Sequence, residues 1–241
     1  MYGERGKIGL ITLATDTSVL PEFQRLMPEG VQVYPAPIEL PRGEVTAAAL
    51  AEMLEGDQLE RAASLLAWAE VGVILFACTS GSLVHGPGWD RTISDRISGV
   101  SGIRATTTTT AVLDTLRSLQ ARRLVIATPY LDEINAIERD FFEQSGFEVL
   151  AIGGLQCGTD HAIGRLAPRD AVDLVARLAT PEADAMFISC TNWHVVEAIQ
   201  ELQQSYGIPV ISSNLAGGWR SLALIGIDEP WPVLVSRGAK Q

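Results

Sequence analysis

The feature that most constrains this chain is an apolar strand pattern that ends in a cysteine and occurs twice. In the first copy, residues 73–78 read Val-Ile-Leu-Phe-Ala-Cys and lead into Thr79-Ser80-Gly81. In the second copy, residues 185–190 read Ala-Met-Phe-Ile-Ser-Cys and lead into Thr191-Asn192. A short apolar run that stops at small polar residues is typical of a buried strand in a parallel sheet. Each copy therefore predicts a strand that carries a thiol at its carboxyl end.

The repeat extends beyond these two strands. Residues 8–12 match residues 124–128, and residues 102–106 match residues 207–211. A further strand is expected from residue 31 to residue 34, where Pro35 follows. Strands that alternate with helical segments predict parallel sheets with helices on both faces. We therefore expect an α/β protein of two pseudo-symmetric halves, each a parallel sheet flanked by helices.

The repeat also sets the expected boundaries. The first half is expected over residues 7–115 and contains Cys78, and the second is expected over residues 122–226 and contains Cys190. Residues 227–241 show no clear periodicity and are expected to pack back on the first half. Ligands bind at the carboxyl ends of parallel strands. The two thiols are therefore expected to face each other in one cleft between the halves.

Composition excludes several classes of partner. The chain has 47% hydrophobic residues and a formal net charge of -11. An acidic chain is a poor partner for nucleic acid, because phosphate binding depends on clustered Lys and Arg. No apolar run approaches the roughly 20 residues of a membrane span, and the first residues do not resemble a signal peptide. We expect a cytoplasmic protein with neither a membrane nor a nucleic acid as its partner.

The cysteines and histidines suggest neither a disulfide framework nor a metal site. Three cysteines, without a Cys-x-x-Cys pair, and three histidines, without ligand spacing, match no common pattern of either kind. Sequence motifs for a phosphate loop, a nucleophile elbow or a dinucleotide fold are also absent from the sequence. We therefore expect chemistry that uses no cofactor and no metal.

Each repeated thiol is expected beside hydrogen-bond donors. Unpaired backbone N–H groups at a strand-to-helix junction favour a thiolate, and they favour a bound carboxylate as well. The hydroxyl and amide side chains after each cysteine add further donors. A thiolate can attack carbon, or remove a proton from it, when donors hold the resulting negative charge. We therefore predict that Cys78 and Cys190 are catalytic residues at a site for a small carboxylate.

Other polar residues have two interpretations each. Tyr130 is either a substrate contact or a packed core ring, and Asp16 either belongs to the site or caps the loop after the first strand. His194 is either part of the site or an exposed residue of the first helical turn. Cys157 is interpreted as a core residue. The threonines at residues 106–110 are interpreted as the end of a strand and the cap of a helix.

Four motifs carry a resemblance to a known superfamily: Leu13-Ala14-Thr15-Asp16, Ala77-Cys78-Thr79-Ser80-Gly81, Ala127-Thr128-Pro129-Tyr130 and Ser189-Cys190-Thr191-Asn192. With these motifs the chain resembles the aspartate/glutamate racemase superfamily from about residue 7 to residue 226. More narrowly, it is similar to the branch of maleate cis-trans isomerases, arylmalonate decarboxylases and the related ectoine-utilisation proteins. The paired cysteines are specific to the superfamily and only weakly informative about the substrate.

The resemblance implies a cofactor-independent isomerase or racemase of a small carboxylate, most like maleate cis-trans isomerase. In the isomerases of this branch one cysteine adds to the double bond, which then rotates as a single bond. Cys78 would be that nucleophile and Cys190 its acid/base partner. The resemblance also implies a homo-oligomer, a dimer or a tetramer. The residues that would bind the substrate carboxylates are Thr79, Ser80, Tyr130, Thr191 and Asn192.

Alternative functions stay open at this point. Arylmalonate decarboxylases usually keep only the second cysteine, with glycine at the first, so the pair in this chain argues against a simple decarboxylase. Asp16 stands where maleate isomerases carry asparagine, and it is the residue type that glutamate racemases use near a substrate amine. Asp16 therefore favours a racemase of an amino-acid derivative. An alternative of a different class is a carboxylate-binding sensor whose sulfurs are idle.

Overall fold

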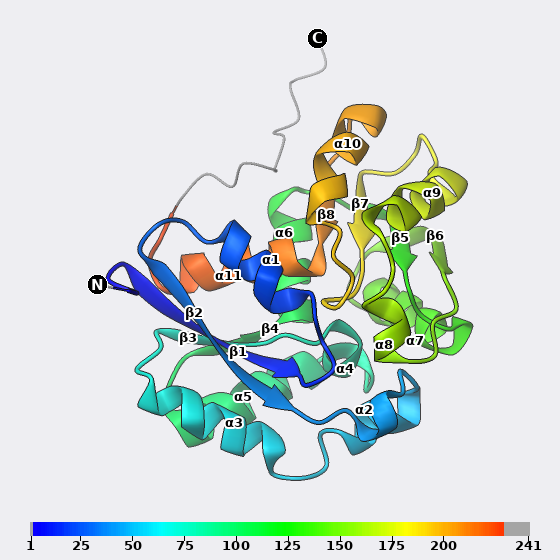
Figure 1. The fold of residues 1–241 in the computed structure, drawn as a ribbon. Helices are drawn as coiled ribbons and strands as arrows, with labels where there is room; N and C mark the ends of the chain where they lie inside the picture. The colour runs from blue at the N-terminus through cyan, green and yellow to red at the C-terminus, as the bar shows by residue number, and fades with distance from the viewer. Residues whose placement is uncertain (1, 229–241) are drawn as a thin grey trace.

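The fold consists of two four-stranded parallel sheets in one chain (Figure 1). The computed structural model describes residues 2–228 of the 241 residues. The strand order is β2-β1-β3-β4 in the first sheet and β6-β5-β7-β8 in the second. Because the order of strands is the same in both sheets, the expected pair of pseudo-symmetric α/β halves is confirmed.

The thiol-bearing strands β3 and β7 occupy equivalent interior positions in the two sheets. Both strands are fully buried because helices cover both faces of each sheet. The first sheet contains β1 (Gly6–Leu13), β2 (Val31–Ile38), β3 (Val73–Phe76) and β4 (Ala105–Thr107). The second sheet contains β5 (Arg123–Thr128), β6 (Glu148–Gly154), β7 (Ala185–Ile188) and β8 (Val210–Ser212).

The helices alternate with these strands along the chain. Those of the first half are α1 (Val19–Leu26), the 3-10 helix η1 (Pro41–Gly43), α2 (Ala47–Glu52), α3 (Gln58–Trp68), α4 (Thr79–Leu83), α5 (Trp89–Ser101) and α6 (Thr108–Ser118). Those of the second half are α7 (Asp132–Gln144), α8 (Asp160–Ile163), α9 (Pro168–Leu178), α10 (Val196–Tyr206) and α11 (Ser213–Leu224). Within residues 2–228, none of them is long and apolar enough to cross a membrane.

Strand β2 is longer than the sequence suggests. It continues through Pro35 and Pro37 to Ile38, so the expected end before Pro35 is wrong. β2 lies at the edge of the sheet and pairs only with β1. A proline on an edge strand removes no ladder hydrogen bond when its nitrogen faces away from the neighbouring strand. The two prolines are two residues apart, so their nitrogens face the same, open side.

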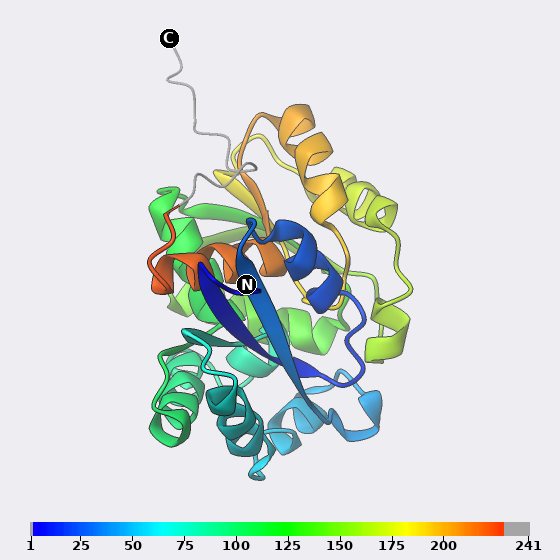
Figure 2. The ribbon, with the colours of Figure 1, turned by 60° about the vertical axis from the view of Figure 1, so that its left-hand side comes forward.

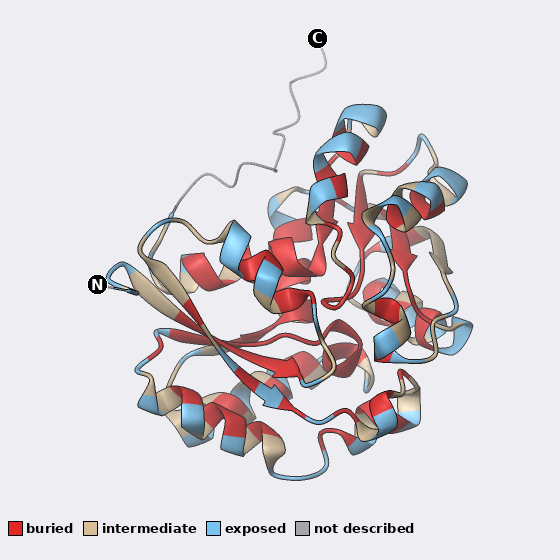
Figure 3. Cartoon of the chain, viewed as in Figure 1, coloured by how far each residue is buried: buried red, intermediate tan, exposed pale blue. Residues whose placement is uncertain are grey.

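Helices α6 and α11 lie between the two sheets and contact each other (Figure 2). Although α6 follows the last strand of the first sheet, its Val112 and Leu116 pack in a core cluster with Phe187 of β7. In α11, which follows the second sheet, a Cβ atom at Gly217 would lie 2.9 Å from Leu75 of β3. Figure 3 shows these central helices as largely buried, whereas α3, α9 and α10 have exposed outer faces. Each half therefore places its last helix against the sheet of the other.

Loops from the two halves meet at the carboxyl ends of the strands. The Thr17 amide donates to Asn192 Oδ1 at 2.9 Å, and the Ser18 hydroxyl donates to the Asn192 carbonyl at 2.8 Å. Glu44 of the first half forms an isolated antiparallel bridge with Thr159 of the second. These contacts hold the two carboxyl edges facing each other.

The expected packing of the tail falls mostly outside the described residues. Ile225 and Ile227 lie against the first sheet, since a Cβ atom at Gly6 would be 2.5 Å from Ile225 Cδ1 and 3.7 Å from Ile227 Cδ1. Residues 229–241 are not described. The boundaries at residues 115 and 122 stay a prediction.

Gly154 at the end of β6 provides a test of this packing. A Cβ atom there would lie 2.2 Å from the Tyr130 carbonyl oxygen and 2.6 Å from Asn135 Nδ2. Backbone cannot move aside cheaply, so we expect Gly154→Ala to lower the free energy of unfolding by about 3 kcal/mol. Gly99, inside α5 with open space around it, is the control. Gly99→Ala should raise stability by about 0.5–1 kcal/mol in the same urea titration, and equal effects would contradict the assigned packing.

Candidate active site

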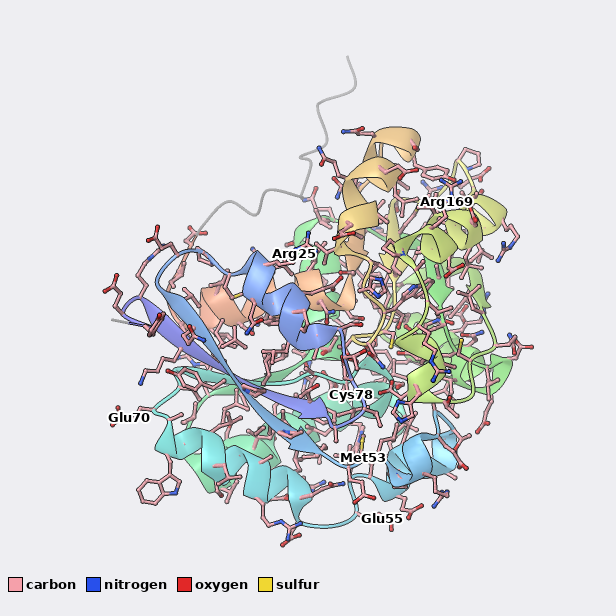
Figure 4. The ribbon with its side chains drawn as sticks, in the orientation of Figure 1. Arg25, Met53, Glu55, Glu70, Cys78 and Arg169 are labelled. Carbon is pink, nitrogen blue, oxygen red and sulfur yellow. The ribbon has the colours of Figure 1, made fainter. Side chains whose placement is uncertain are left out.

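The two repeated thiols line one cavity between the sheets. Cys78 follows β3 and Cys190 follows β7, and both are buried. The cavity is narrow, with a volume of about 10 Å³. Figure 4 shows Cys78 near the carboxyl edge of the first sheet. The residues that line the cavity are Leu13, Leu40, Val45, Leu50, Cys78, Thr79, Ser80, Tyr130, Asp160, Cys190 and Thr191. The structure therefore brings both predicted catalytic residues and four of the six predicted substrate-binding residues to one cavity.

Cys78 is held by the turn that begins α4. It is the N-cap residue of this helix, and the Gly81 amide and the Ser80 hydroxyl donate hydrogen bonds to its sulfur. Gly81 is required by close packing, because a Cβ atom there would lie 2.7 Å from Met53 Cε and 3.0 Å from Cys78 Sγ. A side chain at this position would displace the thiol or the methionine.

Cys190 has a strained backbone. Its φ angle is +112°, a region that residues with a Cβ atom rarely adopt. Its amide donates to Ser213 Oγ at 3.0 Å, and the Tyr130 hydroxyl hydrogen bonds to its sulfur. Such strain persists only where surrounding contacts impose it, and it often marks a functional position.

Both thiols are protonated in this cavity at neutral pH. Burial raises the pKa of Cys78 to about 12, and the Asp160 and Asp16 carboxylates add to the increase. Burial and the same carboxylates raise the pKa of Cys190 well above its usual value. The expectation that backbone donors favour a thiolate is therefore wrong. Loss of water outweighs the donors, because a charged sulfur is costly in an apolar enclosure.

One carboxyl oxygen of Asp16 caps the loop after β1, and the other has no hydrogen-bond partner within residues 2–228. Its Oδ1 accepts from the Ser18 amide at 2.8 Å and from the Val19 amide at 2.9 Å. Its Oδ2 is buried and has no hydrogen-bond partner among residues 2–228. Burial raises the pKa of Asp16 to about 7. Asp16 does not line the cavity, but its charge is close enough to raise the pKa of both thiols.

Asp160 is a site residue that the sequence reasoning missed. It begins α8, is 3% exposed, lines the cavity and accepts from the Thr15 hydroxyl at 2.6 Å. Burial raises its pKa. The available signal was its place in a glycine-containing loop after strand β6, at Gly158-Thr159-Asp160. No Lys or Arg is among the described residues of the cavity wall, so neutral donors alone face these carboxylates.

Asn192 lies beside the cavity and holds loops together. Its side-chain oxygen accepts from the Thr17 amide, and its Nδ2 donates to the Asp160 carbonyl at 2.9 Å. Both ends of its side-chain amide are thus occupied, and carboxylate binding by Asn192 stays a prediction. Thr191 lines the cavity, and its hydroxyl donates to the Ala77 carbonyl at 3.3 Å.

His194 and Cys157 lie elsewhere. His194 lines a separate surface pocket with Glu22 and Arg25, and Cys157 is half-buried with its thiol 3.9 Å from the Leu155 carbonyl oxygen. Neither lines the thiol cavity. The threonine segment has its expected structural role, since the Thr107 hydroxyl accepts from the Thr110 amide and caps α6.

Tyr130 and Glu138 are both buried, and the charge of Glu138 influences the Tyr130 hydroxyl. Tyr130 is 1% exposed, and burial, the sulfur of Cys190 and the charge of Glu138 raise its pKa. Glu138 of α7 is fully buried, and neither carboxyl oxygen has a geometrically formed hydrogen bond within residues 2–228. Burial raises the pKa of Glu138 to about 8, and the nearby Ser189 hydroxyl offsets a part of this increase. Glu138 is therefore neutral at pH 7.

Comparison with known proteins assigns this chain to one family. The family model described as arylmalonate decarboxylase matches residues 8–233. Arylmalonate decarboxylase from Bordetella bronchiseptica is 31% identical over 156 residues, which are 64% of this chain and 65% of that protein. The chain thus spans slightly less than two thirds of that relative's length.

Two similar solved structures are maleate isomerases. One is a cysteine-to-alanine variant of the maleate isomerase Iso from Pseudomonas putida S16 with maleate, with a TM-score of 0.89, 24% identity and coverage of 94% of each chain. The other is a cysteine-to-serine variant of the Nocardia farcinica maleate cis-trans isomerase with a covalently bound succinylcysteine intermediate. Its TM-score is 0.85 at 22% identity, with coverage of 92% of this chain and 93% of that one. These two likenesses show the fold.

The buried Glu138 predicts a specific pH dependence of stability. Its pKa is about 8 in the folded protein against an ordinary value of 4.5, so the unfolded chain loses this proton first as pH rises. The group therefore lowers stability progressively between pH 4.5 and 8, by about 1.4 kcal/mol per pH unit at most. We expect the stability difference between Glu138→Gln and the wild type to increase in favour of the variant across this range.

Denaturant unfolding at pH 5, 6.5 and 8 measures this difference. Other buried carboxyl groups are present in both proteins and cancel in the comparison. Glu143→Gln, an exposed change on the same helix, is the control and should show a difference that stays constant with pH. A constant difference for Glu138→Gln as well would show that its carboxyl group is not buried in neutral form.

Proposed function

Because this chain belongs to the arylmalonate decarboxylase family, we propose that it is a cofactor-independent isomerase that acts on a small unsaturated carboxylate through two cysteines. The observation that carries the proposal is that Cys78 and Cys190, one from each half, line the same cavity. The maleate bound to one structural relative, and the succinylcysteine in another, support a reaction of the maleate isomerase type.

The reaction begins with loss of the Cys78 proton. Burial keeps the thiol neutral, so a base must take its proton before it attacks. Asp160 is the carboxylate on the cavity wall and is the candidate acceptor. The sulfur then forms a bond to one alkene carbon, and the π electrons move to the carbon next to the far carboxylate. A nucleophile that is ionised only during the reaction avoids the cost of a permanent buried charge.

Rotation and elimination complete the cycle. The former double bond is single in the adduct and rotates. Donors that face the cavity hold the negative charge on the substrate. Cys190, with the Tyr130 hydroxyl beside it, gives a proton to the carbanionic carbon and takes the same proton back before elimination. The carbon–sulfur bond then breaks, the trans double bond forms, and Cys78 regains its proton. Hydrogen-bond donors that are already oriented toward the developing negative charge are expected to contribute most to the rate enhancement. The donors are Thr79, Ser80, Tyr130 and Thr191, the last of which must first release its bond to the Ala77 carbonyl.

A second candidate is racemisation of an amino-acid derivative. Asp160 on the cavity wall and the unpartnered oxygen of Asp16 nearby favour a substrate that has a cationic or hydrogen-bond-donating group. A dicarboxylate would bring two negative charges to a wall without Lys or Arg among the described residues. In this reaction one cysteine first gives its proton to a carboxylate of the site, and its thiolate then removes the α-proton, while the other thiol gives its proton to the opposite face of the carbon. Decarboxylation of a substituted malonate is supported by the Bordetella relative, but it needs only one proton donor.

The remaining expectations are not decided by this geometry. Dimer or tetramer formation and a cytoplasmic location stay predictions. A carboxylate sensor with idle sulfurs has the same cavity, and it differs from the enzyme in having no turnover.

Substitution of the cysteines tests the assigned roles. We expect Cys78→Ala and Cys190→Ala each to reduce kcat by about 10³-fold or more, since each removes a group that reacts directly. Cys157→Ala is the matched control, because Cys157 lies outside the cavity, and it should retain activity within about twofold. Circular dichroism and thermal unfolding establish that the variants fold. Full turnover by both Cys78→Ala and Cys190→Ala would refute the two-thiol mechanism.

Incubation in D2O separates the candidate reactions. The protein is offered maleate, aspartate, glutamate, diaminobutyrate derivatives and phenylmalonate, and the products are read by NMR. Fumarate without deuterium is the expected result for addition and rotation, whereas deuterium at an α-carbon indicates racemisation. CO2 release from phenylmalonate indicates decarboxylation. If none of these compounds reacts but one binds, the sensor interpretation replaces the enzyme.

A further inference from the structure

A chain of two hydroxyl groups connects the thiol sites of the two halves. Ser213 is the first residue of α11 and is fully buried. Its Oγ accepts a hydrogen bond from the Cys190 amide at 3.0 Å and lies 2.8 Å from the hydroxyl of Thr79. Thr79 follows Cys78 and lines the cavity. The connection therefore runs from the backbone of one thiol residue to the neighbour of the other.

The number of protons fixes the direction of this connection. A serine hydroxyl has one proton to donate, and the Cys190 amide already occupies one of its lone pairs. Within residues 2–228, the Thr79 hydroxyl is the only hydrogen-bond acceptor that the Ser213 proton has. Thr79 is itself only 1% exposed, so in either direction one of the two buried protons needs an acceptor in the cavity. Of the two residues only Thr79 lines the cavity, so both protons are satisfied only when Ser213 donates to Thr79 and Thr79 donates to a bound carboxylate. Ser213 therefore donates to Thr79, and the Thr79 proton is left for a group inside the cavity.

Ser213 also restrains the strained residue. The Cys190 backbone, at φ +112°, keeps its orientation only while its amide has this buried acceptor. Without the hydroxyl, the amide would lack a partner and the backbone would relax toward a common conformation. The position of the Cys190 sulfur depends on the same backbone.

We propose that Ser213 is a positioning residue that couples the two halves of the site: it fixes the Cys190 backbone and orients the Thr79 hydroxyl as a donor to a substrate carboxylate. The proposal rests on the proposed function in one respect, that the cavity takes a carboxylate. Ser213 itself does not line the cavity. Its effect reaches the ligand through Thr79, and this route distinguishes it from a residue needed only for folding.

A pair of thiol reagents that differ in charge tests this route without turnover. Iodoacetate carries a carboxylate and iodoacetamide is its neutral counterpart. Their rates of reaction at Cys78 and Cys190 are measured at pH 8 by peptide mass spectrometry in a Cys157→Ala background. The ratio of the two rates reports how well the cavity holds a carboxylate, and thiol exposure cancels in the ratio. A failed substrate panel would leave this measurement intact, so the two proposals can fail separately.

We expect Ser213→Ala to lower the iodoacetate-to-iodoacetamide ratio about tenfold, as loss of a charge-assisted hydrogen bond would. Thr79→Val should lower it at least as much. The double variant should then equal Thr79→Val within about twofold, because Ser213 acts through Thr79. Ser221→Ala is the control: Ser221 is buried in the same helix, and its hydroxyl donates to the Gly217 carbonyl. Its ratio should stay within about twofold of the parent.

Ser213→Cys guards against a folding artefact. It is close to serine in size and has a weak donor, so it should fold and still show a reduced ratio. An unchanged ratio in Ser213→Ala or Ser213→Cys would overturn the proposal. Effects of Ser213→Ala and Thr79→Val that multiply in the double variant would also overturn it, as would an equal loss in Ser221→Ala.

Discussion

Apolar packing of α6 and α11 between the sheets is the interaction on which the site depends. Each half contributes one wall of the cavity. The positions of the two walls are therefore fixed only if the two sheets keep their relative position. Val112 of α6 packs with Phe187 of the second sheet, and Gly217 of α11 allows close contact with Leu75 of the first. Buried apolar surface of this kind resists sliding, because a core packs at the density of a crystal. Packing fixes the distance between the two sheets, and hydrogen bonds between the loops then fix their orientation.

Enclosure sets the chemistry of the groups inside. The same burial raises the pKa of Cys78, Asp16 and Glu138, so the site is kept close to neutral by loss of water. Buried charge would oppose folding, and neutral acids and thiols avoid this cost. A substrate that brings its own charge changes the balance, since a proton can then move between groups that lie together. The reactive state is thus a property of the complex.

The sequence predicted the parts of the site that strands deliver. Cys78 and Cys190 follow buried strands whose pattern is visible in the chain, and Thr79, Ser80, Tyr130 and Thr191 follow from their place after strands. Asp160 was missed because its place in the cavity depends on how a loop folds back. The sign of the thiol pKa was missed because Leu40, Val45 and Leu50 enclose the cavity, and their approach is tertiary. Pro35 was read as a strand end because edge position cannot be seen in one strand.

The exchange of last helices between the halves has a consequence for how such a duplicated chain can be divided. The repeat suggests two modules that were once alike, yet a cut between α6 and β5 would not release two modules. The first fragment would keep a helix whose apolar face belongs to the second sheet, and the second would keep one that packs on the first. Each fragment would therefore lack part of its own core and carry part of its partner's. Although the two halves repeat the same pattern of strands and helices, each half needs the other to complete its core.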